Sequence, residues 1–303
     1  MRGDLGRIHG SVGVAIDHPN VLLKASPASE LKVKGPRADR IRQYAEQILM
    51  DAGVEGGVEF EVVSDIPEHA GFGSGTQLAL AVGSALSELF GLGLSVEEMA
   101  SKLNRSRISG VGTYAFKQGG FIVDGGHRFD EPDSVPPLVF RSEVPEGWLF
   151  VIGLPEINLG LGGIAEREAF KRLNPPPEGL VGEVSRIVLV KMIPAILERD
   201  IEAFGEAMTA LDFNFGEYWM EVQGGMFSHP IIEEGVEFLL RAGSYGVGQS
   251  SWGPAFYGLV DGRDQAIDVS ERLFEFLNSG GRRGEAFHVR PNNNGAQIKV
   301  AED

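Results

Sequence analysis

The chain has 303 residues, a length that commonly forms two domains, because single hydrophobic cores stop growing at roughly 250 to 300 residues. Its formal net charge of −16 argues against nucleic acid and membranes as partners, since nucleic acid and anionic lipid both bind basic surfaces. The absence of cysteine excludes disulfides, thiolate zinc sites and cysteine nucleophiles.

No apolar run approaches the ~18 residues of a membrane span, and the first residues lack the apolar core of a secretory signal. Hydrophobic residues make up 43% of the chain and charged residues 23%, which are ordinary globular proportions. We therefore expect a soluble, cytoplasmic protein whose chemistry comes from oxygen and nitrogen groups.

Residue periodicity predicts an N-terminal domain over residues 1–143. Alternating residues indicate strands, apolar residues at helical spacing indicate helices, and turn residues between the first two strands predict a hairpin. A serine followed three residues later by glutamate forms a capping box that opens a helix. In chain order these elements are the strands Ser11–Ile16 and Val21–Ala25, the helix Arg37–Met50, the strand Val58–Val62, the buried helix Leu78–Phe90 and the helix after Ser95.

An acidic, proline-rich stretch from Pro132 to Pro137 indicates a boundary, so that a second domain is predicted over residues 144–303. Helical patterns dominate this domain and short strands interrupt them, which is typical of an α+β domain. The predicted elements are the strand Trp148–Ile152, helices around Ile164–Leu173, Val184–Leu197, Ile201–Leu211 and Ile231–Arg241, the strand Ala255–Val260, the helix Asp264–Leu277, the polar turn Asn292–Asn294 and the strands Ala286–Val289 and Gln297–Val300.

A glycine-rich turn, Pro67–Gln77, follows a strand and opens a helix. Glycine lets a ligand approach the backbone, the first helical N–H groups lack partners within the helix, and the helix dipole adds about half a positive charge there. The turn therefore predicts an anion site, although a tight turn also needs glycine for its dihedral angles alone. A second glycine-rich loop, Gly246–Gly253, predicts a cleft between the two domains.

These loops resemble those of the GHMP family, named for galactokinase, homoserine, mevalonate and phosphomevalonate kinases. The first is similar to the phosphate loop Pro-x-x-x-Gly-Leu-Gly-Ser-Ser-Ala, and the second lies where the family has a C-terminal glycine motif. Nearly the whole chain also resembles the archaeal β-ribofuranosylaminobenzene 5′-phosphate synthases, a non-kinase branch of this fold. The matching segments include Gly6–Arg7, Gly13–Ala15, Gly71–Gly83, Gly112–Phe116, Gly119–Gly126, Val222–Gly225 and Gly248–Pro254.

The resemblance implies a two-domain, GHMP-kinase-like α+β fold, with an N-terminal α/β domain that carries the phosphate loop and a ferredoxin-like C-terminal domain. Two features depart from it. GHMP kinases commonly carry Ser-Gly-x-Asp, whose aspartate handles the acceptor proton, but here Ser109-Gly110-Val111 precedes Gly112. The family's first strand, with Pro-x-Arg-Leu-His and Ile-Asp, is expected to be missing with any catalytic aspartate on it, because the sequence starts almost at Gly6.

The synthase resemblance further implies a decarboxylating phosphoribosyl transfer in methanopterin biosynthesis. Such enzymes join phosphoribosyl pyrophosphate to para-aminobenzoate or 4-hydroxybenzoate as a C-riboside and release CO₂ and pyrophosphate. Mg²⁺ would enter with the pyrophosphate, no organic cofactor is expected, and a homodimer is the expected assembly. Two alternatives stay open, which are an ATP-dependent GHMP small-molecule kinase and a catalytically inactive sugar-phosphate-binding module.

Site residues follow from the same resemblance. Arg7 is the candidate catalytic cation that neutralises pyrophosphate. Asp124 is the candidate sugar-facing carboxylate or magnesium ligand, weighed against a turn aspartate before two glycines. Glu166 and Glu168 are further carboxylate candidates. The expected substrate-binding residues are Gly71, Gly73, Ser74, Gly75, Thr76 and Gln77 in the first loop and Gly248, Gln249, Ser250, Ser251 and Trp252 in the second.

An aromatic acceptor needs a flat pocket, for which the candidates are Trp252, Phe116 and Tyr218, although aromatic residues are more often core. The six histidines show no metal-binding spacing, so that a histidine-based metal centre is not expected. A small basic cluster precedes Ser109, and we interpret it as a solvated surface because charged residues mostly lie outside. Its members are Lys102, Arg105 and Arg107.

Overall fold

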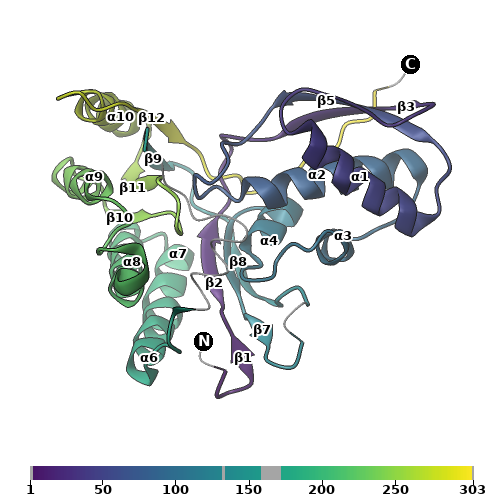
Figure 1. Cartoon of the computed structure of the whole chain (residues 1–303). Helices are drawn as coiled ribbons and strands as arrows, with labels where there is room; N and C mark the ends of the chain where they lie inside the picture. The colour runs from purple at the N-terminus through teal and green to yellow at the C-terminus, as the bar shows by residue number, and fades with distance from the viewer. Residues whose placement is uncertain (1–2, 132–133, 158–171, 302–303) are drawn as a thin grey trace.

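The structure, a computed structural model, describes residues 3–131, 134–157 and 172–301, and the chain forms two lobes (Figure 1). Glu166, Glu168 and most of the predicted helix around Ile164–Leu173 lie outside the described residues. Within the described ranges, none of the helices has the length and apolar character needed to cross a bilayer.

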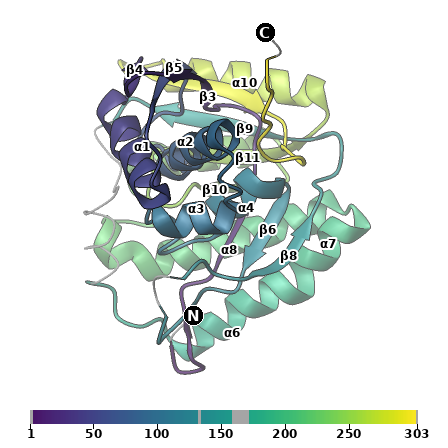
Figure 2. The same cartoon turned by 90° about the vertical axis from the view of Figure 1, so that its right-hand side faces the viewer.

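The upper part of the N-terminal lobe is a small sheet covered by two helices (Figures 1 and 2). Inward-facing residues of the central strand pack with both helices in one buried cluster, as the alternating valines and phenylalanine predict. The strand leads through the glycine-rich turn directly into the second helix. The strand order is β3–β5–β4, with β3 (Leu22–Ala28), β4 (Lys32–Lys34) and β5 (Gly57–Ser64), and the helices are α1 (Ala38–Ala52) and α2 (Ser74–Phe90).

A second sheet of this lobe has the order β2–β6–β8, and a short pair β1–β7 extends beside it. The predicted capping box is confirmed, because the Ser95 hydroxyl accepts from the Glu98 N–H and the Glu98 carboxylate accepts from the Ser95 N–H. The elements are β1 (Arg7–Ile8), β2 (Ser11–Val14), α3 (Val96–Lys102), α4 (Val111–Gln118), β6 (Phe121–Asp124), β7 (His127–Arg128) and β8 (Leu138–Ser142).

The predicted hairpin between the first two strands is wrong. Strand β2 pairs antiparallel with β6, and strand β3 pairs antiparallel with β5, so that they belong to different sheets. The intervening turn forms its backbone hydrogen bonds with the far end of the chain, since the Asp17 N–H donates to the carbonyl of Arg290 at 2.9 Å. Long-range pairing has therefore replaced the local turn.

The C-terminal lobe is the expected ferredoxin-like domain, a fully antiparallel sheet in the order β10–β11–β9–β12. Residues Trp148, Phe150 and Ile152 of its long strand face one helical layer, and Leu149 and Val151 face the other. The strands are β9 (Trp148–Pro155), β10 (Gly246–Gln249), β11 (Phe256–Asp261) and β12 (Gly284–Val289), and the helices are α6 (Glu178–Arg186), the π-helical η1 (Ile187–Met192), α7 (Ile193–Glu198), α8 (Ile201–Gln223), α9 (Pro230–Arg241) and α10 (Arg263–Leu277).

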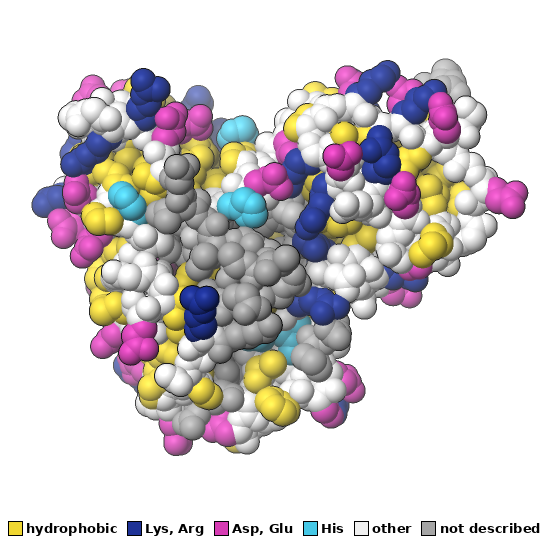
Figure 3. Space-filling model, in the orientation of Figure 1, with side chains coloured by type: hydrophobic (Ala, Val, Ile, Leu, Met, Phe, Trp, Pro, Cys, Tyr) yellow, Lys and Arg dark blue, Asp and Glu magenta, His cyan; other side chains and the backbone are white. Residues whose placement is uncertain are grey.

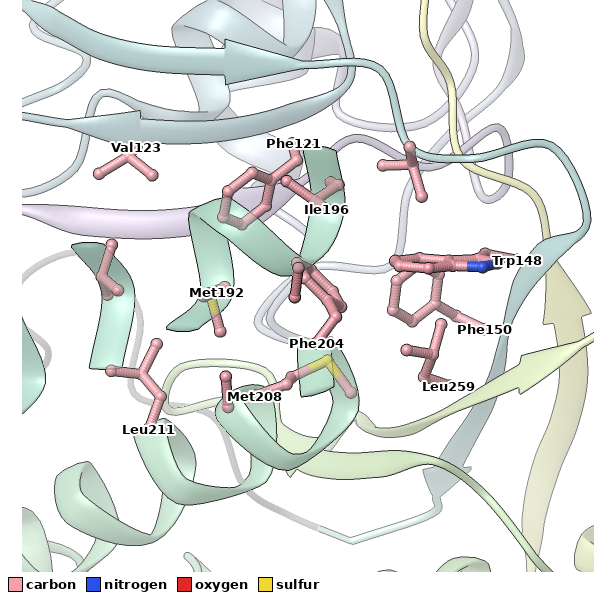
Figure 4. Close-up of a cluster of buried hydrophobic side chains, with 14 of the residues drawn as sticks. Phe121, Val123, Trp148, Phe150, Met192, Ile196, Phe204, Met208, Leu211 and Leu259 are labelled. Carbon is pink, nitrogen blue, oxygen red and sulfur yellow. The ribbon is translucent and has the colours of Figure 1, made fainter. Parts of the chain in front are cut away.

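One hydrophobic core joins the two lobes (Figure 4). Phe121 and Val123 of strand β6 enter the same buried cluster as Trp148 of β9 and Phe204 of α8, and the Phe121 and Phe204 rings meet edge to face with centroids 5.4 Å apart. Because this apolar surface is continuous, separating the lobes would expose it to water. We expect the lobes to keep a fixed relative position.

The C-terminal segment after β12 returns to the N-terminal lobe, where Figure 2 shows it running beside α4. The predicted strand Gln297–Val300 is not formed, since these residues lack ladder partners among the described residues. Instead, Asn293 donates through Nδ2 to the carbonyl of Val144 at 3.0 Å and accepts at Oδ1 from the Val144 N–H at 2.9 Å. The polar turn is thus a clasp, which we call the asparagine clasp, between distant parts of the chain.

Candidate functional site

The glycine-rich turn forms the N-terminus of helix α2. Gly71 and Gly73 have φ angles of +93° and +67°, which are backbone conformations that favour glycine. The helix begins at Ser74, four residues before the apolar pattern predicts, with no acidic residue in its first turn and no side-chain cap among the described residues. An anion would therefore meet backbone N–H groups and the positive end of a 17-residue helix without a competing carboxylate.

The structure brings the two glycine-rich loops together. The Ser250 hydroxyl donates to the carbonyl of Gly71 at 2.8 Å, and the Ala255 N–H donates to the carbonyl of Ala70 at 3.3 Å. A Cβ atom on Gly253 would overlap the backbone of Ala70 and Gly71. The loops therefore meet where the two lobes join, and glycine permits the approach.

Residues at the end of the first loop connect it to helix α4. The Gln77 side chain donates through Nε2 to the carbonyl of Gly112 at 2.8 Å, and a Cβ atom on Gly112 would lie 3.2 Å from the methyl group of Thr76. Gly112 therefore lies beside the phosphate loop. It occupies the position at which GHMP kinases commonly carry an aspartate. The described structure has no carboxylate in that slot.

Two residues of the second loop fix its shape, and one of them, Gln249, also lines the cleft. Gln249 is buried, and its Oε1 accepts from the N–H and hydroxyl of Ser228 while its Nε2 donates to the carbonyl of Ser251 at 2.6 Å. A Cβ atom on Gly248 would overlap the carboxylate of Asp212. Gln249 and Gly248 thus hold the loop against helix α8.

Asp212 of helix α8 is a cleft residue that the sequence reasoning missed. Its carboxylate accepts from the Gln249 N–H at 3.0 Å and from the Tyr257 hydroxyl at 2.5 Å. Burial raises the pKa of Asp212 to about 7, and the two hydrogen bonds oppose that rise. Burial next to this carboxylate also raises the pKa of the Tyr257 hydroxyl.

We expect the Asp212→Asn variant to gain stability over the wild type as pH rises. In the unfolded chain the carboxyl releases its proton near pH 4, whereas in the folded protein it does so near 7, so that the wild type loses unfolding free energy between these values. The variant has no carboxyl at this position and so lacks this loss. Its free energy of unfolding relative to the wild type should therefore be about 2 to 4 kcal/mol higher at pH 8 than at pH 4. Urea unfolding of both proteins at pH 4 and pH 8 measures this difference. An equal difference between variant and wild type at the two pH values would contradict the raised pKa of Asp212.

Aromatic side chains of helix α8 form a stacked row with Trp252. The rings of Trp219 and Trp252 stack with centroids 4.6 Å apart at 22°, and those of Phe215 and Trp219 stack 5.3 Å apart at 20°. Trp252 is 2% exposed. Of the other predicted aromatic residues, Tyr218 lines the cleft on the same helix and donates its hydroxyl to the carbonyl of Asn174 at 2.5 Å.

The third predicted aromatic residue, Phe116, lies apart from this row. It is on helix α4, packs beside the buried cluster around Met99, and its carbonyl accepts from the Ala296 N–H at 2.7 Å. Phe215 and Trp219 were not among the predicted aromatic residues. Their spacing of four residues on one helix was the available signal.

Asp124 is 2% exposed and already has several donors. Its Oδ2 accepts from the Gly110 N–H at 2.8 Å and from the Ser11 hydroxyl, and its Oδ1 accepts from the Gly126 N–H at 2.9 Å. The bond to Gly126 is that of a turn aspartate. Because Gly110 precedes helix α4, the carboxylate also ties β2 and β6 to that helix, and Asp124 itself lines the cleft.

The structure does not place Arg7 in the cleft. Its Nε and Nη2 donate to the carbonyls of Gly125 and Gly126 at 2.6 and 2.8 Å, and it lines a separate surface recess with Phe129. Arg105, which the sequence analysis assigned to the solvated surface, lies instead beside the phosphate loop. Its Nη1 lies 3.2 Å from the point where a Cβ atom on Gly75 would be.

A cleft of about 2600 Å³ runs between the lobes and is lined by both glycine-rich loops, the aromatic row and Arg105. In Figure 3, Lys and Arg side chains lie, beside Asp and Glu side chains, on the part of the N-terminal lobe that faces the C-terminal lobe. Among the described residues, no group of three or more histidine, aspartate or glutamate side chains could hold a metal ion. The cleft is thus lined by charged side chains of both signs from the N-terminal lobe and by the aromatic rings of helix α8.

Comparison with known proteins identifies the fold and the family. The sequence matches the family described as GHMP kinases N terminal domain over residues 39–120 and GHMP kinases C terminal over residues 192–279. The crystal structure of homoserine kinase from Cytophaga hutchinsonii aligns with a TM-score of 0.71 over 94% of this chain and 90% of its own, at 18% identity. This likeness confirms the GHMP-kinase-like fold.

Two archaeal relatives share more of the sequence. The beta-ribofuranosylphenol 5′-phosphate synthase of Methanothermobacter thermautotrophicus is 32% identical over 96% of this chain and 94% of its own. The protein of the same name from Archaeoglobus fulgidus is 32% identical over 99% of this chain and 95% of its own. Together with the two glycine-rich loops that meet in the cleft, these matches show that the chain belongs to the beta-ribofuranosylphenol 5′-phosphate synthase family of the GHMP kinase fold.

Proposed function

We propose that this protein transfers the phosphoribosyl group of phosphoribosyl pyrophosphate to an aromatic acid and forms a C-riboside. The observation that carries the proposal is that one cleft contains both an anion site and aromatic rings. Helix α2 and Arg105 offer N–H groups and a cation to phosphate, while the half-buried rings of Phe215 and Trp219 line the same cleft and stack over the buried Trp252. An anionic sugar and a flat acceptor are the substrates that such a cleft fits.

The reaction balances without an oxidant or an external base. The bond between ribose C1′ and pyrophosphate breaks, with its electron pair leaving on pyrophosphate, and the ring carbon that bears the carboxylate forms the new bond to C1′. The ring then loses CO₂, and the electron pair of the broken carbon–carbon bond restores aromaticity. The relatives are named for a phenol product, which favours 4-hydroxybenzoate over para-aminobenzoate as the acceptor.

The protein's tasks in this reaction are binding and electrostatic stabilisation. The N-terminus of α2 would hold phosphate oxygens, and carboxylates such as Asp212 would favour positive charge that develops on the ribose. Mg²⁺ would supply further charge neutralisation on the pyrophosphate, where it keeps several waters and needs few protein ligands. Carboxylates that line the cleft, such as Asp212, are the protein groups available to it.

The kinase alternative has less support. Gly112 lies beside Thr76 at the place where a GHMP kinase carries its aspartate, so that the group that orients an acceptor hydroxyl is missing there. We also propose a cytoplasmic location, which the lack of cysteine supports.

The deciding experiment uses carboxyl-labelled acids. Purified protein with phosphoribosyl pyrophosphate, Mg²⁺ and carboxyl-labelled 4-hydroxybenzoate should release labelled CO₂ and equimolar pyrophosphate, and labelled para-aminobenzoate tests the second acceptor. Omission of phosphoribosyl pyrophosphate is the control and should abolish the release. Folded protein that releases no CO₂ from either acid, but forms ADP from ATP with an alcohol acceptor, would show the protein to be a kinase.

A further inference from the structure

Arg105 lies on a short connection between helices α3 and α4 that brings it to the phosphate loop. Its guanidinium is partly buried, its Nε donates to the carbonyl of Leu103 at 3.1 Å, and its Nη1 lies 3.2 Å from the Cβ position of Gly75. The ring of Tyr44 lies 5.7 Å from the guanidinium carbon. The side chain is therefore directed along the first turn of α2, where the anion site lies.

The backbone around Arg105 is held in an unusual conformation. The neighbours Asn104 and Ser106 have φ angles of +54° and +61°, in the left-handed region that residues other than glycine rarely adopt. A hydrogen bond between the buried hydroxyls of Ser106 and Thr113 fixes this conformation, and the Arg105 N–H donates to the carbonyl of Ala100 at 2.7 Å. The connection thus places the arginine rather than leaving it to solvent.

The basic residues nearby have other structural roles. Arg37 forms an ion pair with Asp65, and Arg40 donates through Nε to the Tyr44 hydroxyl at 2.8 Å. Lys102, three residues before Arg105, pairs with Asp51 at 3.3 Å on the outer surface. Among these residues, Arg105 is the one whose Nη1 lies against the first turn of α2, 3.2 Å from the Cβ position of Gly75.

We propose that Arg105 binds a phosphate group of the sugar substrate and holds it against the first turn of α2. This inference rests on the proposed function, and it adds a residue to the binding site. The guanidinium fork presents parallel N–H donors to phosphate oxygens, and the loop N–H groups complete the site from the other side. Loss of such charge-assisted bonds weakens binding about 10- to 100-fold.

The test compares Arg105→Gln with Lys102→Gln, a neighbouring charge removal outside the cleft. Calorimetry measures the affinity of each protein for inorganic pyrophosphate and for ribose 5-phosphate in the presence of Mg²⁺, and circular dichroism confirms folding. We expect Arg105→Gln to lose at least tenfold in affinity for one of the two ligands. The ligand that is affected shows whether Arg105 contacts the pyrophosphate group or the 5′-phosphate of the substrate. Lys102→Gln should bind both as the wild type does.

Steady-state kinetics provides a second readout. In Arg105→Gln the KM for phosphoribosyl pyrophosphate should rise while the KM for the aromatic acid stays unchanged, and Arg105→Lys should recover part of the loss. Wild-type affinity in Arg105→Gln for both ligands, or equal losses in the two glutamine variants, would overturn the assignment. Binding is measured without turnover, so a protein that binds pyrophosphate through Arg105 but releases no CO₂ refutes the proposed reaction alone.

Discussion

The Gly253→Ala variant is expected to lose about 100-fold or more in kcat/KM for phosphoribosyl transfer, because a displacement of about 1 Å in an active site has effects of that size. The added methyl group would overlap the backbone atoms of Ala70 and Gly71, and neither is the end of a flexible side chain that can move aside. The two glycine-rich loops must separate, and the anion site at α2 moves with the first loop. Labelled CO₂ release at varied substrate concentration measures the loss.

A matched control is Gly179→Ala in helix α6. Gly179, like Gly253, has a φ angle outside the left-handed region, and a Cβ atom there meets open space. This control should keep wild-type activity and change the free energy of unfolding by no more than about 0.5 kcal/mol, because Gly179 is an exposed residue of the first helical turn. Equal activity of Gly253→Ala and the wild type would show that the contact between the loops has no part in the reaction.

Among the variants proposed for this protein, Arg37→Ala should lower the free energy of unfolding most. The Arg37 and Asp65 side chains are 9% and 15% exposed and form a two-pronged ion pair, with Nε donating to Oδ2 at 2.5 Å and Nη2 to Oδ1. Asp65 also accepts from the Ile66 N–H at 2.7 Å just before the glycine-rich turn. The Arg37→Ala variant leaves this carboxylate buried without its cation, which costs about 3 to 5 kcal/mol of unfolding free energy.

Urea unfolding at pH 7 tests this expectation against two further variants. Arg42→Ala removes an arginine whose partner, Asp39, is exposed, so its free energy of unfolding should change by no more than about 0.5 kcal/mol. Adding Asp65→Asn to Arg37→Ala removes the unpaired charge and should recover part of the loss. The double variant should therefore unfold at a higher urea concentration than Arg37→Ala alone, and the reverse order would rule out the buried charge as the cause.

The elements that could be predicted from the sequence are those with local causes. Periodic apolar residues predicted helices α1, α9 and α10 closely, and the alternation in β5 predicted its buried face. The start of α2 was predicted too late, because Ser74 to Gln77 carry no apolar pattern although their backbone is helical. The hairpin failed because the pairing of β2 with β6 spans more than a hundred residues, which local turn chemistry does not reveal.

In the candidate site, too, only the features with a local sequence pattern could be predicted. The glycine-rich loops were recognisable because backbone N–H groups at a helix start have a sequence signature, and the structure brings the loops together. Arg105 was assigned to the surface because charged residues mostly lie outside. Its actual position depends on left-handed conformations at Asn104 and Ser106, which a sequence without glycine there does not reveal. Asp212 and Gln249, which are hydrogen-bonded, are 37 positions apart, and no spacing rule connects them.

The asparagine clasp has a consequence for synthesis of the chain on the ribosome. Val144 and Asn293 are 149 positions apart, so that at roughly 5 to 20 residues per second the nascent N-terminal lobe waits about 7 to 30 s for its last contact. During that time the carbonyl of Ala15 and the N–H of Gly120, which later bond to Asn292, have no such partner, and the Phe121 side chain lacks its cover from α8. These contacts of the N-terminal lobe therefore form only after residues 292 and 293 have left the exit tunnel, long after the lobe itself has been synthesised.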